Sequence, residues 1–389
     1  MLNIAGLFSP KLRAFLKVRN QQELPSNLKG CIWMHCASLG EFEQGRPILE
    51  TIKSSRPETK IVLSFFSNSG YNARKNYHLA DWVGYLPMDT KKDSRLFVNT
   101  VQPAVAIFVK YEFWFNHLDR LITSGIPFIF VSSYWWKGHF LLQPWNKWLL
   151  KKVIKANALF VQDQNSKVLL DQVGCKNAIV AGDTRIDRVL SIKKSNATIP
   201  FFQSAQSGIP IFIAGSSWWE DETIIKEWYD QNQNFKLIIV PHDVSPYRIQ
   251  QVMDLFKEFS PIQYTDWEGS EYNVMIVNKI GILNKLYSYA TIAYIGGGFG
   301  RGIHNILEPA VYGIPVVFGP NFTSFKEATD MIGRSIAFSI NNVTQLIEIT
   351  NTFSQKKLER IKKGSEEYIN ENKGATDLII KHLFKLITS

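Results

Sequence analysis

The sequence predicts an α/β protein of two domains, each built on a parallel sheet, and three observations support this. The chain has 389 residues, more than one ordinary domain core accommodates. Short apolar runs rich in β-branched and aromatic residues recur along it and alternate with helical patterns. The runs are apolar on both faces, which is typical of strands in a parallel sheet covered by helices on each side.

The elements follow one another in two series. The first series of apolar runs predicts strands at residues 31–36, 60–66, 82–87, 104–109, 127–132, 158–162 and in the run NAIVA that precedes residue 182. A polar, irregular segment at 191–208 predicts a linker. The second series lies at 209–217, 235–241, 272–278, 290–298 and 314–319, and a Lys- and Glu-rich helical tail begins near 355. We therefore expect one domain at 1–190 and a second at 209–389 that includes the C-terminal helix.

Composition and charge narrow the classes of partner. The 44 Lys and Arg residues exceed the 34 Asp and Glu residues, so the net charge is +10. This surplus favours an anionic partner and leaves nucleic acid, phosphate-bearing metabolites and an acidic membrane face open. The three cysteines lack CxxC spacing, and the seven histidines show no HxxH or HExxH spacing. We therefore expect neither a disulfide framework nor a metal site.

Two segments carry the composition of a membrane-surface element. Residues 1–20 alternate apolar and basic side chains and are interrupted by Pro10. Residues 134–155 interleave Trp135, Trp136, Trp145 and Trp148 with lysines. A helix packed on the protein body explains either segment as well, and the second also suits single-stranded nucleic acid.

Polar residues that come directly after three strands of the first domain are candidates for catalysis or ligand binding. Glu41, in HCASLGE, begins a helix after a strand and suits either a general base or a helix cap. Lys110 and Glu112, in KYEFWFN, suit either a site or a surface ion pair. Arg185, in GDTRID, suits either an anion contact or a structural pair with Asp187.

In the second domain, the segment GGGFGRGIHNILEPA at 296–310 follows a strand and leads into a helix. Such a glycine-rich turn binds phosphate or serves as a hinge. Asn305 and Glu308 lie one helical turn apart, and Glu308 could take the two hydroxyls of a ribose. The segments PHD at 241–243 and NKIGIL at 278–283 also follow strands, and backbone groups of the second can read a base edge.

In this order, the segments SLGE, KYEFWFN, GDTRID, PHD, IGIL and HNILEPA resemble the motifs of the 3-deoxy-D-manno-octulosonic acid (Kdo) transferases of lipid A assembly. The resemblance covers about residues 30 to 375, nearly the whole chain. It implies the GT-B fold, in which two Rossmann-like domains with parallel sheets face each other across a cleft. It also implies an inverting, metal-independent glycosyltransferase without a cofactor.

The resemblance assigns roles to residues of the first domain. Glu41 matches the Glu of the family's S-V-G-E motif, the proposed general base. Arg185 stands where the family has Lys in G-S-L-K-F-D, a cation that stabilises the departing phosphate. Glu112 matches the second Glu of E-T-E-L-W-P-N, whereas Lys110 replaces the first.

The resemblance also implies the residues that bind the donor. Pro241 and His242 match a Pro-Arg pair at the nucleotide, and the turn that holds the cytosine matches 280–282. The ribose and phosphate contacts match 305–308. The implied donor-binding residues are therefore Pro241, His242, Ile280, Gly281, Ile282, Asn305, Ile306, Leu307 and Glu308.

The activity implied by the resemblance is transfer of Kdo from CMP-Kdo to a lipid A precursor, lipid IVA, at the cytoplasmic face of the inner membrane. The expected partners are CMP-Kdo, the lipid acceptor and an anionic membrane surface, with attachment either peripheral or through the N-terminus. Nucleic acid and an obligate protein partner are not expected. Two alternatives stay open: a transferase or epimerase that uses a UDP-sugar, and a basic nucleic-acid- or membrane-binding module without enzymatic activity.

Overall fold

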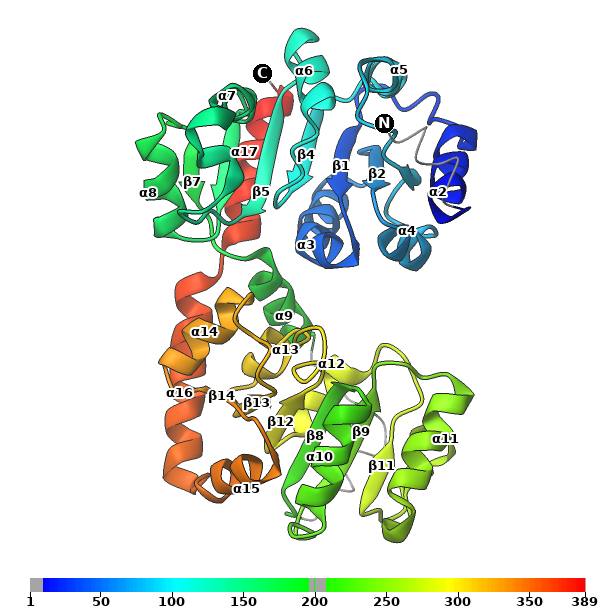
Figure 1. Cartoon of the computed structure of the whole chain (residues 1–389), viewed down its shortest axis with the longest axis vertical. Helices are drawn as coiled ribbons and strands as arrows, with labels where there is room; N and C mark the ends of the chain where they lie inside the picture. The colour runs from blue at the N-terminus through cyan, green and yellow to red at the C-terminus, as the bar shows by residue number, and fades with distance from the viewer. Residues whose placement is uncertain (1–9, 196–198, 200–207, 389) are drawn as a thin grey trace. The chain divides into compact units, whose positions relative to one another are not determined.

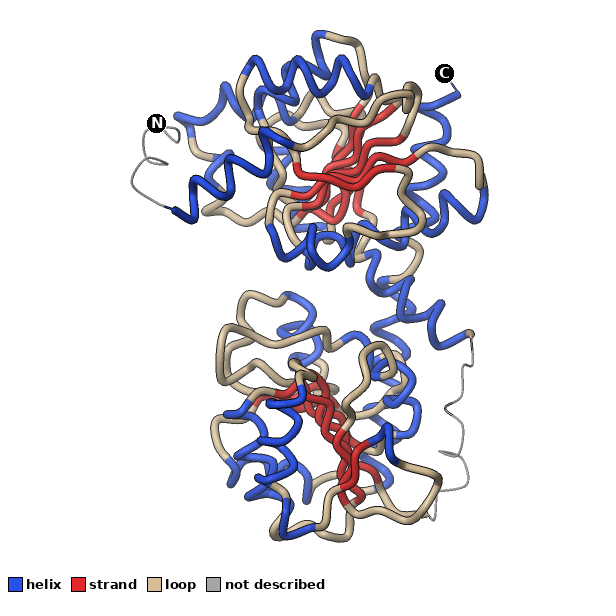
Figure 2. The backbone as a smooth tube through the Cα atoms, turned by 90° about the vertical axis from the view of Figure 1, so that its right-hand side faces the viewer, coloured by secondary structure: helices blue, strands red, loops and turns tan. Residues whose placement is uncertain are grey.

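The structure is a computed structural model that describes residues 10–195, 199 and 208–388. The described chain forms two compact units. Unit 1 contains the residues up to Asp187 together with those from Asn372 onward, and unit 2 contains Arg188–Glu371. In each unit the strands form an inner layer with helices on both sides (Figures 1 and 2). The predicted fold class is thus confirmed at the level of two parallel α/β units.

Unit 1 contains a sheet of seven parallel strands in the order β3-β2-β1-β4-β5-β6-β7. The strands are β1 (Ile32–Cys36), β2 (Ile61–Phe65), β3 (Trp82–Tyr85), β4 (Val105–Val109), β5 (Phe128–Ser133), β6 (Ala158–Val161) and β7 (Ala178–Val180). The helices are α2 (Pro10–Gln21), α3 (Leu39–Ser55), α4 (Asn68–Arg74), α5 (Lys91–Val101), α6 (Phe115–Thr123), α7 (Lys147–Val153), α8 (Gln164–Gln172) and α17 (Ala375–Thr388). The order of the strands reverses between β1 and β4, the position where open parallel sheets bind ligands.

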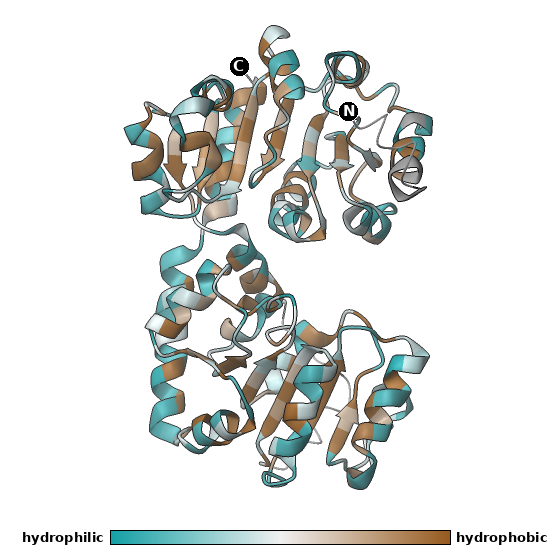
Figure 3. Cartoon of the chain, in the orientation of Figure 1, coloured by the Kyte–Doolittle hydropathy of each residue, from teal (hydrophilic) through white to brown (hydrophobic). Residues whose placement is uncertain are grey.

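Alternation along the strands divides the apolar side chains of unit 1 into two cores. Ile32 and Met34 of β1 pack with residues of α3 and α17 on one face, whereas Trp33 packs with residues of α5 and α6 on the other. Neighbouring side chains of a strand point to opposite faces, so a strand buried on both sides reads as a continuous apolar run. Figure 3 shows this concentration of hydrophobic residues on the strands.

Unit 2 repeats the arrangement with seven parallel strands in the order β10-β11-β9-β8-β12-β13-β14. The strands are β8 (Ile211–Ser217), β9 (Lys236–Pro241), β10 (Ile262–Gln263), β11 (Val274–Ile276), β12 (Ile292–Ile295), β13 (Val316–Phe318) and β14 (Ala337–Ser339). The helices are α10 (Trp219–Tyr229), α11 (Pro246–Leu255), α12 (Leu283–Leu286), α13 (Leu307–Ala310), α14 (Lys326–Gly333), α15 (Val343–Asn351) and α16 (Gln355–Asn372). A further helix, α9 (Thr184–Lys194), spans the boundary between the units.

The C-terminal helix differs from the expectation, because α17 belongs to unit 1 and not to the second domain. Ile379 and Leu383 are fully buried in the core that β1, β4 and α3 share. The carboxylate of Asp187 accepts hydrogen bonds from the backbone N–H groups of Gly374 (2.6 Å) and Thr376 (2.7 Å). This contact begins the helix on unit 1. Most of the expected linker at 191–208 lies outside the described residues.

The described part of the N-terminal segment is the helix α2, and Pro10 is its first residue. Proline is tolerated there because the first turn of a helix has no partner for its N–H group. Arg19 is buried, with its guanidinium carbon 3.4 Å from the centre of the Phe15 ring and 4.5 Å from that of Tyr85. Burial lowers the pKa of Arg19 to about 10. This end of α2 is therefore packed on the protein body, while residues 1–9 lie outside the described part.

Candidate active site

Glu41 lies in the first turn of α3, directly after β1. Its Oε2 atom accepts hydrogen bonds from the backbone N–H of Ser38 (3.0 Å) and from the Ser38 hydroxyl, while Ser38 caps the helix. The capping interpretation of Glu41 is therefore correct. Oε1 of Glu41 has no hydrogen bond among the described residues. One oxygen of the carboxylate therefore remains available although the other takes part in the cap.

Glu112 lies in the loop after β4. It is hydrogen-bonded by His35 and Trp114, which were not among the site residues predicted from the sequence. Its Oε2 atom lies 3.2 Å from Nε2 of His35 and accepts a hydrogen bond from the Trp114 indole N–H (2.8 Å). His35 is fully buried in β1, and its Nδ1 atom lies 2.9 Å from the hydroxyl of Ser64 in β2. The described hydrogen bonds of Glu112 are therefore made to side chains of the protein interior. They do not include the surface ion pair with Lys110 that the sequence also suggested.

The backbone at the end of β4 has an unusual conformation. Lys110 has a φ angle of +60°, a left-handed conformation that costs energy for a residue with a side chain. Its N–H still donates to the carbonyl of Val131 in β5, so the turn is part of the sheet edge. Glu112, which contacts His35, lies two residues beyond this turn. Residues in such conformations often mark functional sites.

Arg185 lies at the start of α9 and pairs with Asp183, not with Asp187. Its Nε atom donates to both carboxylate oxygens of Asp183, at 3.1 and 3.0 Å. Burial alone would raise the pKa of Asp183, but the charge and hydrogen bonds of Arg185, together with the charge of Lys110, lower it overall. Thr184 between them bonds to the carbonyl of Gln44 in α3, which fixes this turn against the same edge as Glu41.

The predicted residues of unit 1 share one edge of its sheet, and their electrostatic effects agree with this placement. Burial raises the pKa of the Cys36 thiol, and the carboxylates of Glu41 and Glu112 raise it further. The ammonium group of Lys110 contributes to the lowered pKa of Asp183. Because β1, β4 and β7 are parallel strands of one sheet, their carboxyl ends lie at a common edge. Glu41, Glu112 and Arg185 therefore form one candidate site on unit 1.

In unit 2, the glycine-rich segment brings three strand ends close together. A Cβ atom on Gly296 would lie 2.3 Å from the carbonyl oxygen of Ser216, and one on Gly298 would lie 2.5 Å from the backbone nitrogen of Gly319. Buried Asp221 accepts a hydrogen bond from the N–H of Gly297 (2.8 Å) and holds the loop to α10. Close backbone packing thus explains these glycines without a bound phosphate.

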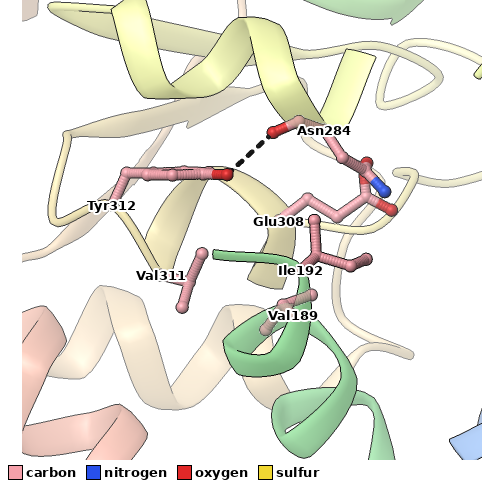
Figure 4. A pocket seen from close by; sticks show the side chains of 6 residues that line it. All are labelled: Val189, Ile192, Asn284, Glu308, Val311 and Tyr312. Carbon is pink, nitrogen blue, oxygen red and sulfur yellow. Dashed lines mark hydrogen bonds between the residues drawn. The ribbon is translucent and has the colours of Figure 1, made fainter. Parts of the chain in front are cut away.

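Asn305 and Glu308 lie together, as their spacing predicts. The amide nitrogen of Asn305 donates to Oε1 of Glu308 at 3.1 Å. Glu308 lines a small pocket with Val189 and Ile192 of α9 and with Tyr312 (Figure 4). Ile306 and Leu307 are buried and anchor this turn. The carboxylate is therefore fixed by its neighbours, in a pocket that also touches α9.

The other predicted donor contacts follow β9 and β11. The ring of His242 stacks on Trp218 at 4.6 Å and on His304 at 4.5 Å. Burial lowers the pKa of His304 to about 4 and also lowers that of His242. The structure thus places stacked aromatic rings next to Pro241, where the resemblance implies a cation.

The turn after β11 is open to solvent. Ile280 is 82% exposed, Gly281 has a φ of +88°, and Ile282 precedes α12. β11, β9, β8 and β12 are neighbours in one parallel sheet, with Pro241 at the end of β9, Ile280 after β11 and Asn305 after β12. The predicted donor residues therefore occupy one edge of unit 2.

Three further observations concern metals and membranes. Within the described ranges, His, Cys, Asp and Glu side chains form no group of three that suits a metal ion. No helix in the described part of the chain is long and apolar enough to cross a bilayer. Of the tryptophans in 134–155, Trp135 is buried, whereas Trp145 (71%) and Trp148 (60%) are well exposed and Trp136 partly so. The interpretation of these indoles as core residues is therefore right for Trp135 only.

Comparison with known proteins finds similarity to 3-deoxy-D-manno-octulosonic acid transferases, in agreement with the motifs in the sequence. Residues 11–188 match the family described as 3-deoxy-D-manno-octulosonic-acid transferase (kdotransferase). The chain is 28% identical over 360 residues to a 3-deoxy-D-manno-octulosonic acid transferase of Aquifex aeolicus, covering 89% of this chain and 92% of that protein. It is 27% identical to a bifunctional glycosyltransferase/methyltransferase of Fusobacterium nucleatum, covering 92% of this chain but 57% of that protein.

Solved structures share the fold. The UDP-GlcNAc 2-epimerase from Neisseria meningitidis has a TM-score of 0.61 and 15% identity, covering 91% of this chain and 99% of the epimerase. At this identity the likeness concerns the fold alone. The chain thus has a fold of the GT-B type, and its sequence is similar to those of 3-deoxy-D-manno-octulosonic acid transferases.

Proposed function

We propose that this chain transfers Kdo from CMP-Kdo to a lipid A precursor such as lipid IVA, with inversion at the anomeric carbon and without a metal ion. The observation that carries the proposal is the placement of Glu41 and Glu112 after the neighbouring parallel strands β1 and β4, in a chain with relatives that are named Kdo transferases. The acceptor binds at this edge of unit 1, and CMP-Kdo binds at the carboxyl edge of unit 2.

In the proposed step, a hydroxyl oxygen of the acceptor attacks the anomeric carbon of Kdo. The bond between that carbon and the phosphate oxygen breaks, CMP leaves with the bonding electrons, and the hydroxyl proton passes to Glu41. A single displacement of this kind inverts the anomeric carbon. Oε1 of Glu41 is the proton acceptor, because Oε2 already binds Ser38. A positioned general base contributes about 10²–10⁴-fold to a rate.

The leaving group gains negative charge, and cations or N–H groups stabilise it. In this proposal Arg185 supplies the cation and the turn at 305–308 supplies contacts to phosphate and ribose. The turn at 280–282 holds the cytosine. His242 has a lowered pKa and stacks on Trp218, so it contributes ring contacts in place of a permanent charge.

The proposal includes attachment to the cytoplasmic face of the inner membrane. Exposed Trp145 and Trp148 are close in sequence to Lys147, Lys151 and Lys152, and the net charge of the chain is +10. Tryptophan and lysine together are typical of surfaces that rest in the headgroup region of anionic membranes. The lipid acceptor is itself a membrane component, so a surface of this kind brings the protein to its substrate.

The test is an assay of CMP release from CMP-Kdo in the presence and absence of lipid IVA. We expect release that depends on both substrates and persists in EDTA. A requirement for added metal would contradict the metal-independent step. Thermal shifts separate the UDP-sugar alternative, because stabilisation by UDP in preference to CMP would assign a different donor.

A further inference from the structure

The carboxylate of Glu112, in the loop after β4, is bound by a buried chain of hydrogen bonds that links the neighbouring strands β1 and β2. The chain runs from Trp33 to Ser64, from Ser64 to His35 and from His35 to Glu112, with distances of 2.8, 2.9 and 3.2 Å. Trp33, His35 and Ser64 are fully buried. Buried polar groups on strands are costly unless every one of them finds a partner.

The donors and acceptors in this chain leave one consistent arrangement for a neutral histidine. The Trp33 indole can only donate, so the Ser64 oxygen accepts from it. A carboxylate can only accept, so Nε2 of His35 carries the hydrogen that faces Glu112. Nδ1 is then an acceptor, and the Ser64 hydroxyl donates to it. This tautomer is inferred from the network, which is how hydrogens on histidine are assigned.

The contacts fix one oxygen of the carboxylate and leave the other available. Both His35 and Trp114 bind Oε2 of Glu112, whereas Oε1 has no hydrogen bond among the described residues. The Glu112 side chain is 13% exposed, and that of His35 is 0% exposed. Glu112 lies two residues after Lys110, whose backbone has the left-handed φ of +60°. Such an arrangement holds a charged group in one orientation while it keeps an atom free for a ligand.

We propose that Ser64 and His35 are positioning residues that orient Glu112, so that Oε1 accepts a hydrogen bond from the sugar acceptor during transfer. The inference rests on the proposed transferase function, and it concerns residues that the family resemblance does not assign. His35 has no contact with substrate in this proposal. It acts by fixing the carboxylate, because small displacements of a positioned group cost up to about 10²-fold in rate.

Two substitutions of His35 separate positioning from simple packing. The amide nitrogen of Gln lies near the Nε2 position of a histidine and can still donate to Glu112. The amide of Asn lies near the Nδ1 position and reaches Ser64 instead. For His35→Asn we expect kcat to fall on the order of 10²-fold with little change in KM, since an interaction made in the transition state is lost. His35→Gln should restore most of kcat, and both variants are first compared by thermal unfolding.

Equal losses of kcat in two folded variants, or no loss in either, would overturn the proposal. A second measurement does not depend on folding of a variant or on transfer activity. Nitrogen NMR of the histidine-labelled wild-type protein should show His35 with a protonated Nε2 and an unprotonated Nδ1. The opposite tautomer would remove the donor to Glu112 and overturn the assignment. If the wild type shows the expected tautomer but releases no CMP, the proposed reaction fails while the hydrogen-bond chain stands.

Discussion

Glu41 has two separable roles at the scale of single residues, as a helix cap and as the proposed base. Glutamine also fits the third position of a capping box, so Glu41→Gln keeps the cap while it removes the proton acceptor. We expect this variant to unfold near the wild-type temperature and to lose about 10²–10⁴-fold in turnover in the CMP-release assay. Near-wild-type turnover would remove Glu41 from the mechanism.

Ser38→Ala is the matched control for Glu41→Gln. It deletes the side chain that caps α3 and leaves the carboxylate in place, so it should cost about 0.5–2 kcal/mol of unfolding free energy. Turnover should change far less than in Glu41→Gln. A loss of turnover as large as that of Glu41→Gln would mean that the cap, not the charge, determines activity.

The pair of Asp183 and Arg185 predicts a dependence of stability on pH. The pKa of Asp183 is lowered in the folded state, so the paired carboxylate stabilises the fold above the unfolded value of about 3.9. This stabilisation is lost as the pH falls through the lower, folded value. Asp183→Asn should therefore differ most from the wild type near neutral pH and least in acid. Chemical denaturation across this range measures the difference, and a constant difference would contradict the assigned cause.

At the same scale, the sequence could place site residues but not their partners. Glu41, Glu112 and Arg185 follow strand ends, which is where parallel sheets carry ligands. Their partners depend on contacts across the sheet, and Ser64 and His35 lie 29 residues apart in sequence. One signal was available, because both are polar residues inside strongly apolar runs. For Arg185, two acids lay equally close in sequence, and the backbone conformation of the turn selected Asp183 over Asp187.

At the scale of helices and strands, the apolar runs in the sequence correctly predicted the long central strands. The predictions failed for elements that have no such run or whose packing partner the sequence does not show. β10 and β14 were not predicted, and both are short strands that are only partly buried, so neither forms a continuous apolar run. α17 was assigned to the wrong unit because helix periodicity shows that an apolar face exists but not which core it enters. The two cores of unit 1 come from residues far apart in sequence, including Ile379 and Leu383.

The placement of α17 predicts which substitutions in the C-terminal helix affect unit 1. Leu383 is fully buried in the core with β1 and α3, so Leu383→Ala should cost about 2–5 kcal/mol of unfolding free energy. Leu378 lies in the same helix and is 39% exposed, and Leu378→Ala should cost much less. Hydrogen exchange should show the added opening in the strands of unit 1. Equal effects of both substitutions, or opening confined to unit 2, would contradict the assignment.

At the scale of the whole molecule, the net charge of +10 and the exposed tryptophans both favour binding to the proposed partner, an anionic membrane surface. Charge attracts the protein to an anionic bilayer over about a Debye length, and indole rings then enter the headgroup region. Trp145 and Trp148 stand on or beside α7. The ammonium group of Lys152 lies 5.6 Å from the ring centre of Trp148, so charge and aromatic surface coincide.

This coincidence predicts that membrane binding is anionic, salt-sensitive and dependent on α7. The full chain should co-sediment with vesicles that contain phosphatidylglycerol, and weakly with pure phosphatidylcholine vesicles. Lysines near a membrane surface contribute about 1 kcal/mol each, so Lys147→Ala with Lys151→Ala should weaken binding roughly 30-fold. Trp145→Ala with Trp148→Ala should also weaken it, whereas Trp219→Ala, a control that removes a comparably exposed indole from unit 2, should not. Equal effects of the three variants, or binding that is unchanged by salt, would mean that another surface holds the membrane.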